Sequence, residues 1–416
     1  MLKYLFSLFL FVGLGHSYAQ VVEDNVYDSN IKSVKFMSGD DQLSFPIHFK
    51  NTTNYVYLTF DDLNEDRNLA YRIIYCNKDW TRSELFYTEY IDGFSDEYLD
   101  DYEFSFNTLV EYANYGIVLP NESVSFKLTG NFVIEVFDAD TENVLLAKRF
   151  LVAESLVGID HRFSRASLVS RLETHQELDF FVKNESFDIL NPRATLSASV
   201  IQNKRWDMAI EGIKPSFVRI DAVDFDYQNK IVFPAGKEFR YMDIRDLTTP
   251  PSHVLDVSTD VYGINVTLKG DRLRSNIAYF ESNDINGGYI ISADDKFNPI
   301  LSGEYVDVLF SYQRSFENLD SDYYIFGELT AFNFQEDARM VYNEAVKGYV
   351  AKMRLKQGYY NYYIVERPKG KDLVDYEITE GNWYETENQY LILIYYRPFG
   401  SRYDQLIGVK MASSRP

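Results

Sequence analysis

The stretch FVIEVFDADTENVLLAKRF, residues 132–150, indicates which kind of fold this chain adopts. Two apolar runs of strand length, 132–137 and 144–150, flank the turn-forming segment Asp138-Ala139-Asp140, which is typical of a β-hairpin. Similar runs, separated by clusters of Gly, Pro, Asn and Asp, recur at residues 55–60, 178–183, 195–202, 265–269, 305–312, 323–327, 360–366 and 389–396. Many short strands at this spacing predict β-sandwiches.

Composition supports an all-β fold. The 34 Tyr, 31 Phe and 3 Trp make up 16% of the 416 residues, and aromatic side chains favour pleated, half-buried surfaces. Helical periodicity is scarce; residues 337–346 fit a short helix. Turn-rich stretches near residues 155–158 and 294–299 predict three immunoglobulin-like sandwich domains in tandem, at residues 20–155, 156–299 and 300–416.

The first 19 residues have the pattern of an export signal. Lys3 precedes an apolar run, and Ser17-Tyr18-Ala19 forms a small-x-small cleavage site. The run is shorter than the roughly 20 apolar residues that a spanning helix needs. Cleavage would leave Gln20 first, where a lipoprotein needs Cys, so we expect no lipid anchor. With Cys76 as its single cysteine, the exported chain has no intramolecular disulfide, and we expect Cys76 to be a buried apolar residue.

Charge excludes several classes of partner. Lys and Arg number 41 against 63 Asp and Glu, which gives a net charge of −22. Nucleic-acid binding depends on cations that neutralise phosphates, and anionic membranes repel an acidic surface. We therefore expect neither nucleic acid nor direct membrane insertion.

Motifs for catalysis or cofactors are missing. The four histidines after residue 19 are isolated, and neither a dinucleotide nor a P-loop fingerprint occurs. Paired carboxylates for glycosidic chemistry stay open, because their geometry is non-local. The acidic residues between 92 and 103 favour a solvated loop, with a cation site as the alternative. We predict no catalytic residue, metal or cofactor.

Aromatic residues near the C-terminus are candidates for a partner interface. The candidates are Tyr359, Tyr360, Tyr362, Tyr363, Trp383 and Tyr390. Alternate residues of a strand face opposite sides, so one set belongs to the core and the other meets a neighbouring domain, a partner protein or a glycan. Trp80, Trp206 and Trp383 follow or precede turns at strand ends, where we expect structural roles.

Several blocks of sequence point to one family. They include YCNKDW at 75–80, TGNF at 129–132, QNKRWD at 202–207, LKQGYYNYY at 355–363, ETENQY at 385–390 and YYR at 395–397. Together they resemble the type IX secretion system plug protein family of Bacteroidetes, formerly DUF5103, over nearly the whole mature chain. Thr129 and Phe132 are small departures from the family pattern.

The resemblance implies a non-catalytic periplasmic protein. It would associate peripherally with the outer membrane by docking beneath a very large translocon barrel, whose periplasmic mouth it closes, and would otherwise be monomeric. The third unit also resembles immunoglobulin-like modules that precede glycogen-active enzymes. This similarity supports an early-set sandwich fold but does not support sugar binding, because a shared fold does not carry function. The alternative function is a secreted glycan-binding β-sandwich protein of a polysaccharide-uptake system.

Overall fold

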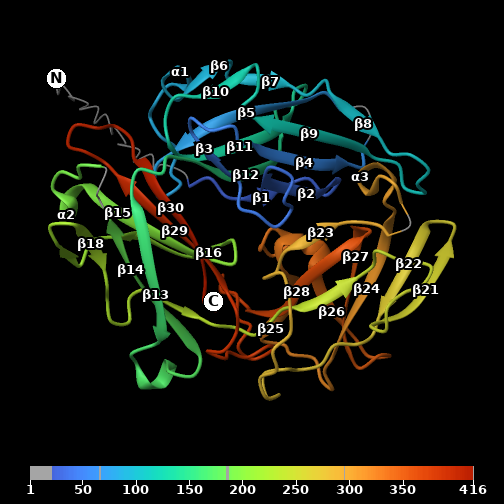
Figure 1. The fold of residues 1–416 in the computed structure, drawn as a ribbon. Coiled ribbons are helices and arrows are strands. Elements are labelled where there is room, and N and C mark those ends of the chain that lie inside the picture. Colours follow the sequence, from blue (N-terminus) through green and yellow to red (C-terminus); the bar gives the residue numbers. More distant parts are fainter. Residues whose placement is uncertain (1–20, 65–66, 184–186, 295, 416) are drawn as a thin grey trace, which may run out of the picture.

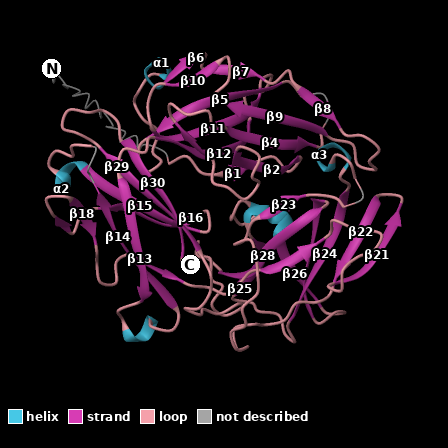
Figure 2. Cartoon of the chain, viewed as in Figure 1, coloured by secondary structure: helices cyan, strands magenta, loops and turns pink. Residues whose placement is uncertain are grey.

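Three β-domains make up the computed structural model, which describes residues 21–64, 67–183, 187–294 and 296–415. In those ranges strands dominate, and the α-helices are three short ones, α1 (Tyr87–Tyr90), α2 (Pro192–Thr195) and α3 (Pro299–Ser302) (Figure 2). The all-β fold class is therefore confirmed. The predicted export signal, residues 1–19, lies outside the described residues.

The first domain, residues 21–154, is a sandwich of two sheets around one apolar core. One sheet contains β1 (Asn25–Val26), β12 (Val144–Ala153), β11 (Gly130–Asp138), β5 (Leu69–Cys76) and β7 (Asp96–Tyr98), with β3 (Ile47–Phe49) parallel to β12. The other contains β2 (Ile31–Ser38), β4 (Val56–Asp62), β9 (Ala113–Leu119) and β8 (Tyr102–Phe104). A separate pair consists of β6 (Ile91–Gly93) and β10 (Val124–Phe126).

The predicted hairpin is the centre of this domain. Strands β11 and β12 pair antiparallel with Phe132 opposite Phe150, as the sequence predicts. Phe132 and Ile134 face the core of the first domain, whereas Val133 packs on the other face against the second domain. Burial on both faces explains why the stretch is a nearly continuous apolar run without alternation.

The second domain combines two distant parts of the chain. One sheet contains β13 (Gly158–Arg165), β14 (His175–Lys183), β18 (Ala222–Phe225) and β17 (Phe217–Val218), with β19 (Val232–Pro234) on β14; the 3-10 turn η1 (Val169–Arg171) connects β13 to β14. The facing sheet contains β16 (Arg205–Ile213), β15 (Leu196–Gln202), β29 (Gln389–Tyr396) and β30 (Gln405–Ser413). Residues 156–235 and 386–415 therefore form this domain, and Figure 1 shows the red C-terminal strands among the green ones.

The third domain, residues 236–385, is inserted into the second. Its strands are β20 (Arg240–Asp243), β28 (Gly358–Pro368), β25 (Ser321–Phe326), β26 (Arg339–Asn343), β27 (Gly348–Lys356), β24 (Tyr305–Gln313), β22 (Gly263–Leu268) and β21 (Val254–Asp260), with β23 (Tyr289–Ile291) on β28. The 3-10 turns η2 (Glu328–Thr330) and η3 (Glu336–Ala338) lie between β25 and β26. All nine strands contribute to one core, so the sheet curls around it.

This arrangement differs from the predicted domains at 156–299 and 300–416. Strand β15 pairs with β29 from Leu196 opposite Tyr396 to Gln202 opposite Tyr390, which joins segments on either side of the predicted boundary. The third domain begins well before residue 300, since β20 already pairs with β28. Turn residues indicate where strands end, but they carry no information about which strands pair.

The short helix expected at residues 337–346 is also wrong. Strand β26 occupies residues 339–343 and pairs with β25 and β27. Met340 is buried while Val341 is exposed, a period of two that fits a strand.

Candidate partner interface

Four of the six aromatic residues predicted at a partner interface are buried inside the chain. Tyr360, Tyr362, Tyr363 and Tyr390 each expose 4% or less of their surface. Such side chains have almost no surface to offer another protein, so the prediction is wrong for these four.

Both faces of β28 are covered by other parts of the chain. Tyr360 and Tyr362 belong to the core of the third domain. Tyr363 points to the opposite face, where its ring stacks on Phe239 with 3.8 Å between centroids. That cluster also contacts Met208 of the second domain. The ring partners of Tyr363, Phe239 and Tyr376, belong to the third domain itself, so Tyr363 lies in a second apolar cluster of that domain at its border with the second domain.

The other three aromatic candidates, Tyr390, Trp383 and Tyr359, differ in how deeply they are buried. Tyr390 lies in the core of the second domain, where its hydroxyl donates to Gln176 Oε1 at 2.7 Å. Trp383 is half-buried, with Lys237 Nζ 4.2 Å above its ring, and Tyr359 is half-buried beside Tyr241. For Trp383 and Tyr359 an interface role stays a prediction.

A single carboxylate joins all three domains. Glu328, in η2 of the third domain, pairs with Lys35 of the first domain at 2.8 Å and with Lys204 of the second at 3.5 Å. Burial alone would raise the pKa of Glu328, but the charges of Lys204 and Lys35 outweigh it and lower that pKa to about 2. The carboxylate therefore stays ionised at neutral pH, where it links the three domains.

The first and third domains share a second buried ion pair. Lys356 Nζ lies 2.7 Å from Asp61 Oδ2, and each side chain is 1% exposed. The Tyr305 hydroxyl donates to the same Asp61 oxygen at 2.7 Å. Nearby, the Tyr112 hydroxyl donates to the carbonyl oxygen of Gly303. Two domains joined through buried charges and hydrogen bonds resist relative motion, because separating them leaves polar groups without partners.

The first and second domains meet through packed sheets. Val133 and Leu151 of the first domain share an apolar cluster with Leu391 and Leu393 of the second. The Tyr395 hydroxyl donates to Asn131 Oδ1 at 2.7 Å across this seam.

Two tryptophans enclose an arginine at the edge of the same seam. Trp80 and Trp206 pack edge to face at 4.8 Å, and the Arg149 guanidinium lies 4.5 Å from the Trp80 ring and 5.5 Å from the Trp206 ring. Trp80 belongs to the first domain and Trp206 to the second. Both tryptophans thus pack structurally, as the sequence predicts.

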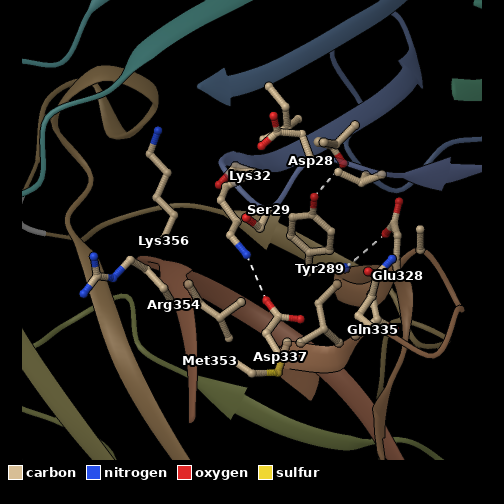
Figure 3. A pocket seen from close by; sticks show the side chains of 18 of the residues that line it. Asp28, Ser29, Lys32, Tyr289, Glu328, Gln335, Asp337, Met353, Arg354 and Lys356 are labelled. Atoms are coloured by element: carbon tan, nitrogen blue, oxygen red, sulfur yellow. Dashed lines mark hydrogen bonds and ion pairs between the residues drawn. The ribbon is translucent and has the colours of Figure 1, made fainter. Parts of the chain in front are cut away.

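A cavity of about 370 Å³ lies between the first and third domains (Figure 3). Lys32, Tyr289, Glu328, Arg354 and Lys356 are among its lining residues. Its cations already have partners within the chain: Lys32 pairs with Asp337, Arg354 with Asp307 and Lys356 with Asp61. We therefore interpret the cavity as a gap between two packed domains and not as a binding site for an anion.

Among the described residues, no three His, Cys, Asp or Glu side chains gather as a metal site requires, and no helix is long and apolar enough to cross a membrane. Cys76 is buried, as predicted, and burial raises the pKa of its thiol to about 12. A thiol in that state is inert.

The sequence reasoning missed the most exposed group of aromatic side chains in the first domain. We call this group the outer edge; it comprises Phe86, Phe94, Tyr98, Tyr102, Phe104 and Phe106. For this stretch our prediction is a solvated acidic loop, with a cation site as the alternative, and no aromatic surface. A usable signal was present, since six aromatics alternate with acids where no Lys or Arg occurs.

One solved structure shares the fold described above. The crystal structure of a hypothetical protein from Parabacteroides merdae matches with 32% identity and a TM-score of 0.89, over 94% of this chain and 98% of that chain. The C-terminal domain of an antigen I/II-family protein from Streptococcus pyogenes aligns over 92% of this chain and 99% of that chain at 8% identity, and its TM-score of 0.17 is too low to indicate a shared fold. No match is found among the curated proteins.

A family model decides the assignment. The model described as "Type 9 secretion system plug protein 1st domain" matches residues 31–154, which span the first domain from β2 to the end of β12. The first domain of this chain therefore belongs to the family of type 9 secretion system plug protein first domains.

Proposed function

We propose that this protein is a non-catalytic periplasmic plug that closes the periplasmic opening of the outer-membrane translocon of type IX secretion. Family membership makes the protein secretion-associated. The observation that favours a plug is the joint at Glu328, where one largely buried carboxylate pairs with lysines from the other two domains. A channel that passes folded proteins needs a wide closure, and three domains fastened in this way can block it by bulk.

The charge of the protein is compatible with this role. A protein with a net charge of −22 associates by preference with basic partner surfaces and does so less well in salt. We propose that the protein sits at the outer membrane only through the translocon, that it binds no nucleic acid, and that it is monomeric outside the complex.

Deleting the gene is expected to leave the outer membrane permeable without abolishing secretion, because the translocon remains but stays open. The measurement is the sensitivity of the bacterium to a large antibiotic that an intact outer membrane excludes. We expect increased sensitivity that a plasmid copy reverses. As a control, removal of both the protein and the translocon should restore exclusion. Sensitivity that stays at the wild-type level, or that persists without the translocon, would argue against a plug.

A further inference from the structure

The outer edge of the first domain is an exposed aromatic surface in a stretch of acidic sequence. Its six aromatic side chains expose between 44% and 76% of their surface. They come from α1, β7 and β8 and the segments beside them, which lie along the upper border of the first domain in Figure 1. Soluble proteins rarely leave so many large aromatics in water on one border unless a partner covers them.

Charge narrows the choice of partner. Between Arg82 and Lys127 the sequence contains ten Asp or Glu residues and neither Lys nor Arg. Asp96, Asp100, Asp101 and Glu103 lie among the exposed aromatics, and among the described residues none of these four carboxylates forms an ion pair. A second copy of this chain, a nucleic acid or an anionic membrane would meet like charge here. A basic protein surface would meet opposite charge.

The edge is held firmly despite its exposure. Strand β7 pairs with β5, and β8 pairs with β9, so both ends of the edge continue the sheets of the first domain. Beyond β8, the backbone N–H of Phe106 donates to the carbonyl oxygen of Leu301 in the third domain at 2.8 Å. A surface that is already ordered loses little conformational entropy on binding.

Contact through side chains fits this edge better than addition of a strand. Strands β7 and β8 have three residues each and carry charged side chains, which are features that discourage pairing with a further strand. Phe and Tyr rings, by contrast, supply apolar area with few torsions to freeze, which is the usual composition of interface centres.

We propose that the outer edge is the face that docks on the translocon, against a periplasmic surface rich in Lys or Arg with apolar side chains between them. This inference rests on the proposed function and adds to it the binding face and its chemistry. The family match, residues 31–154, includes the whole edge.

Two variants of the full mature chain separate the contribution of the aromatic side chains to binding from that of the acidic side chains. The aromatic variant carries Phe94→Ala, Phe104→Ala and Phe106→Ala; the charge variant carries Asp96→Asn, Asp100→Asn, Asp101→Asn and Glu103→Gln. A matched control carries Phe280→Ala, Phe316→Ala and Phe399→Ala, three phenylalanines of the second and third domains that are at least as exposed. Surface changes of this kind leave folding nearly unaffected, and the thermal midpoint of each variant verifies this.

Binding to the purified translocon is measured at low and at high salt. We expect the aromatic variant to bind at least about tenfold more weakly, because interface energy concentrates in buried aromatic anchors. We expect the charge variant to bind more weakly at low salt and with a flatter salt dependence. The control should bind within about twofold of the wild type.

The outcomes distinguish this inference from the function on which it rests. A folded aromatic variant that binds like the wild type, or a control that loses as much affinity, would overturn the docking face and leave the plug intact. A wild type that does not bind the translocon would contradict the proposed function, and the docking face with it.

Discussion

Lys356→Met is expected to destabilise the chain by about 3–5 kcal/mol, because it leaves the Asp61 carboxylate buried without its cation. Hydrogen bonds from Tyr305 and Asn114 to Asp61 remain, but they do not neutralise a charge that is shielded from water. The double variant Lys356→Met with Asp61→Leu should recover most of the loss, since both charges are then gone. The measurement is urea unfolding, followed by circular dichroism.

The chain offers a matched control at the same joint. Lys32 of the first domain pairs with Asp337 of the third at 2.9 Å, but with side chains 20% and 42% exposed. Lys32→Met should therefore cost less than about 1 kcal/mol. If Lys356→Met unfolds at the wild-type urea concentration, the buried pair does not fasten the two domains as described.

Trp80→Ala is expected to cost about 3–5 kcal/mol, because it empties a fully buried site in the seam between the first and second domains. The change also removes the ring that packs on Trp206 and on the Arg149 guanidinium. Thermal unfolding of the variant measures the loss.

Two further variants show whether the loss of stability in Trp80→Ala comes from its buried contacts. Trp383→Ala, at a half-buried site, should cost clearly less than Trp80→Ala. The double variant of Trp80 and Trp206 should reveal a coupling of about 0.5–1.5 kcal/mol, as aromatic pairs do. An unchanged melting temperature for Trp80→Ala would refute the structural role; lost translocon binding by a stable Trp383→Ala would make Trp383 an interface residue.

Local pattern predicted the strands well. The hairpin at 132–150 and the strand at 389–396 were visible because apolar runs end at turn residues, and these signals lie within a few residues of one another. Cys76 was predictable from its apolar neighbours, and its burial follows from the same pattern.

Long-range pairing was not predictable in the same way. The insertion of the third domain into the second depends on Leu196 meeting Tyr396, and nothing local to either residue specifies the other. The same limit explains the error at Tyr363. The sequence predicts that outward tyrosines meet a neighbouring domain, a partner protein or a glycan, but Phe239, from the start of the same inserted domain, stacks on the Tyr363 ring.

The outer edge could have been found from the sequence and was not. The acids at 92–103 predict a solvated loop or a cation site, and that prediction takes no account of the aromatic side chains between them. Phe94 and Phe106 lie in segments too short and too polar to be core strands, which is the physical reason that their rings remain in water.

Closure of the translocon is the central claim, and flux through the reconstituted channel tests it most directly. Translocon purified from a strain that lacks this protein would be placed in lipid vesicles loaded with a fluorescent dextran, oriented with its periplasmic mouth accessible. We predict that the mature chain stops dextran release at about one copy per channel, and that the aromatic variant of the outer edge requires a much higher concentration. Dextran release that continues unchanged while the chain is bound to the translocon would contradict the account.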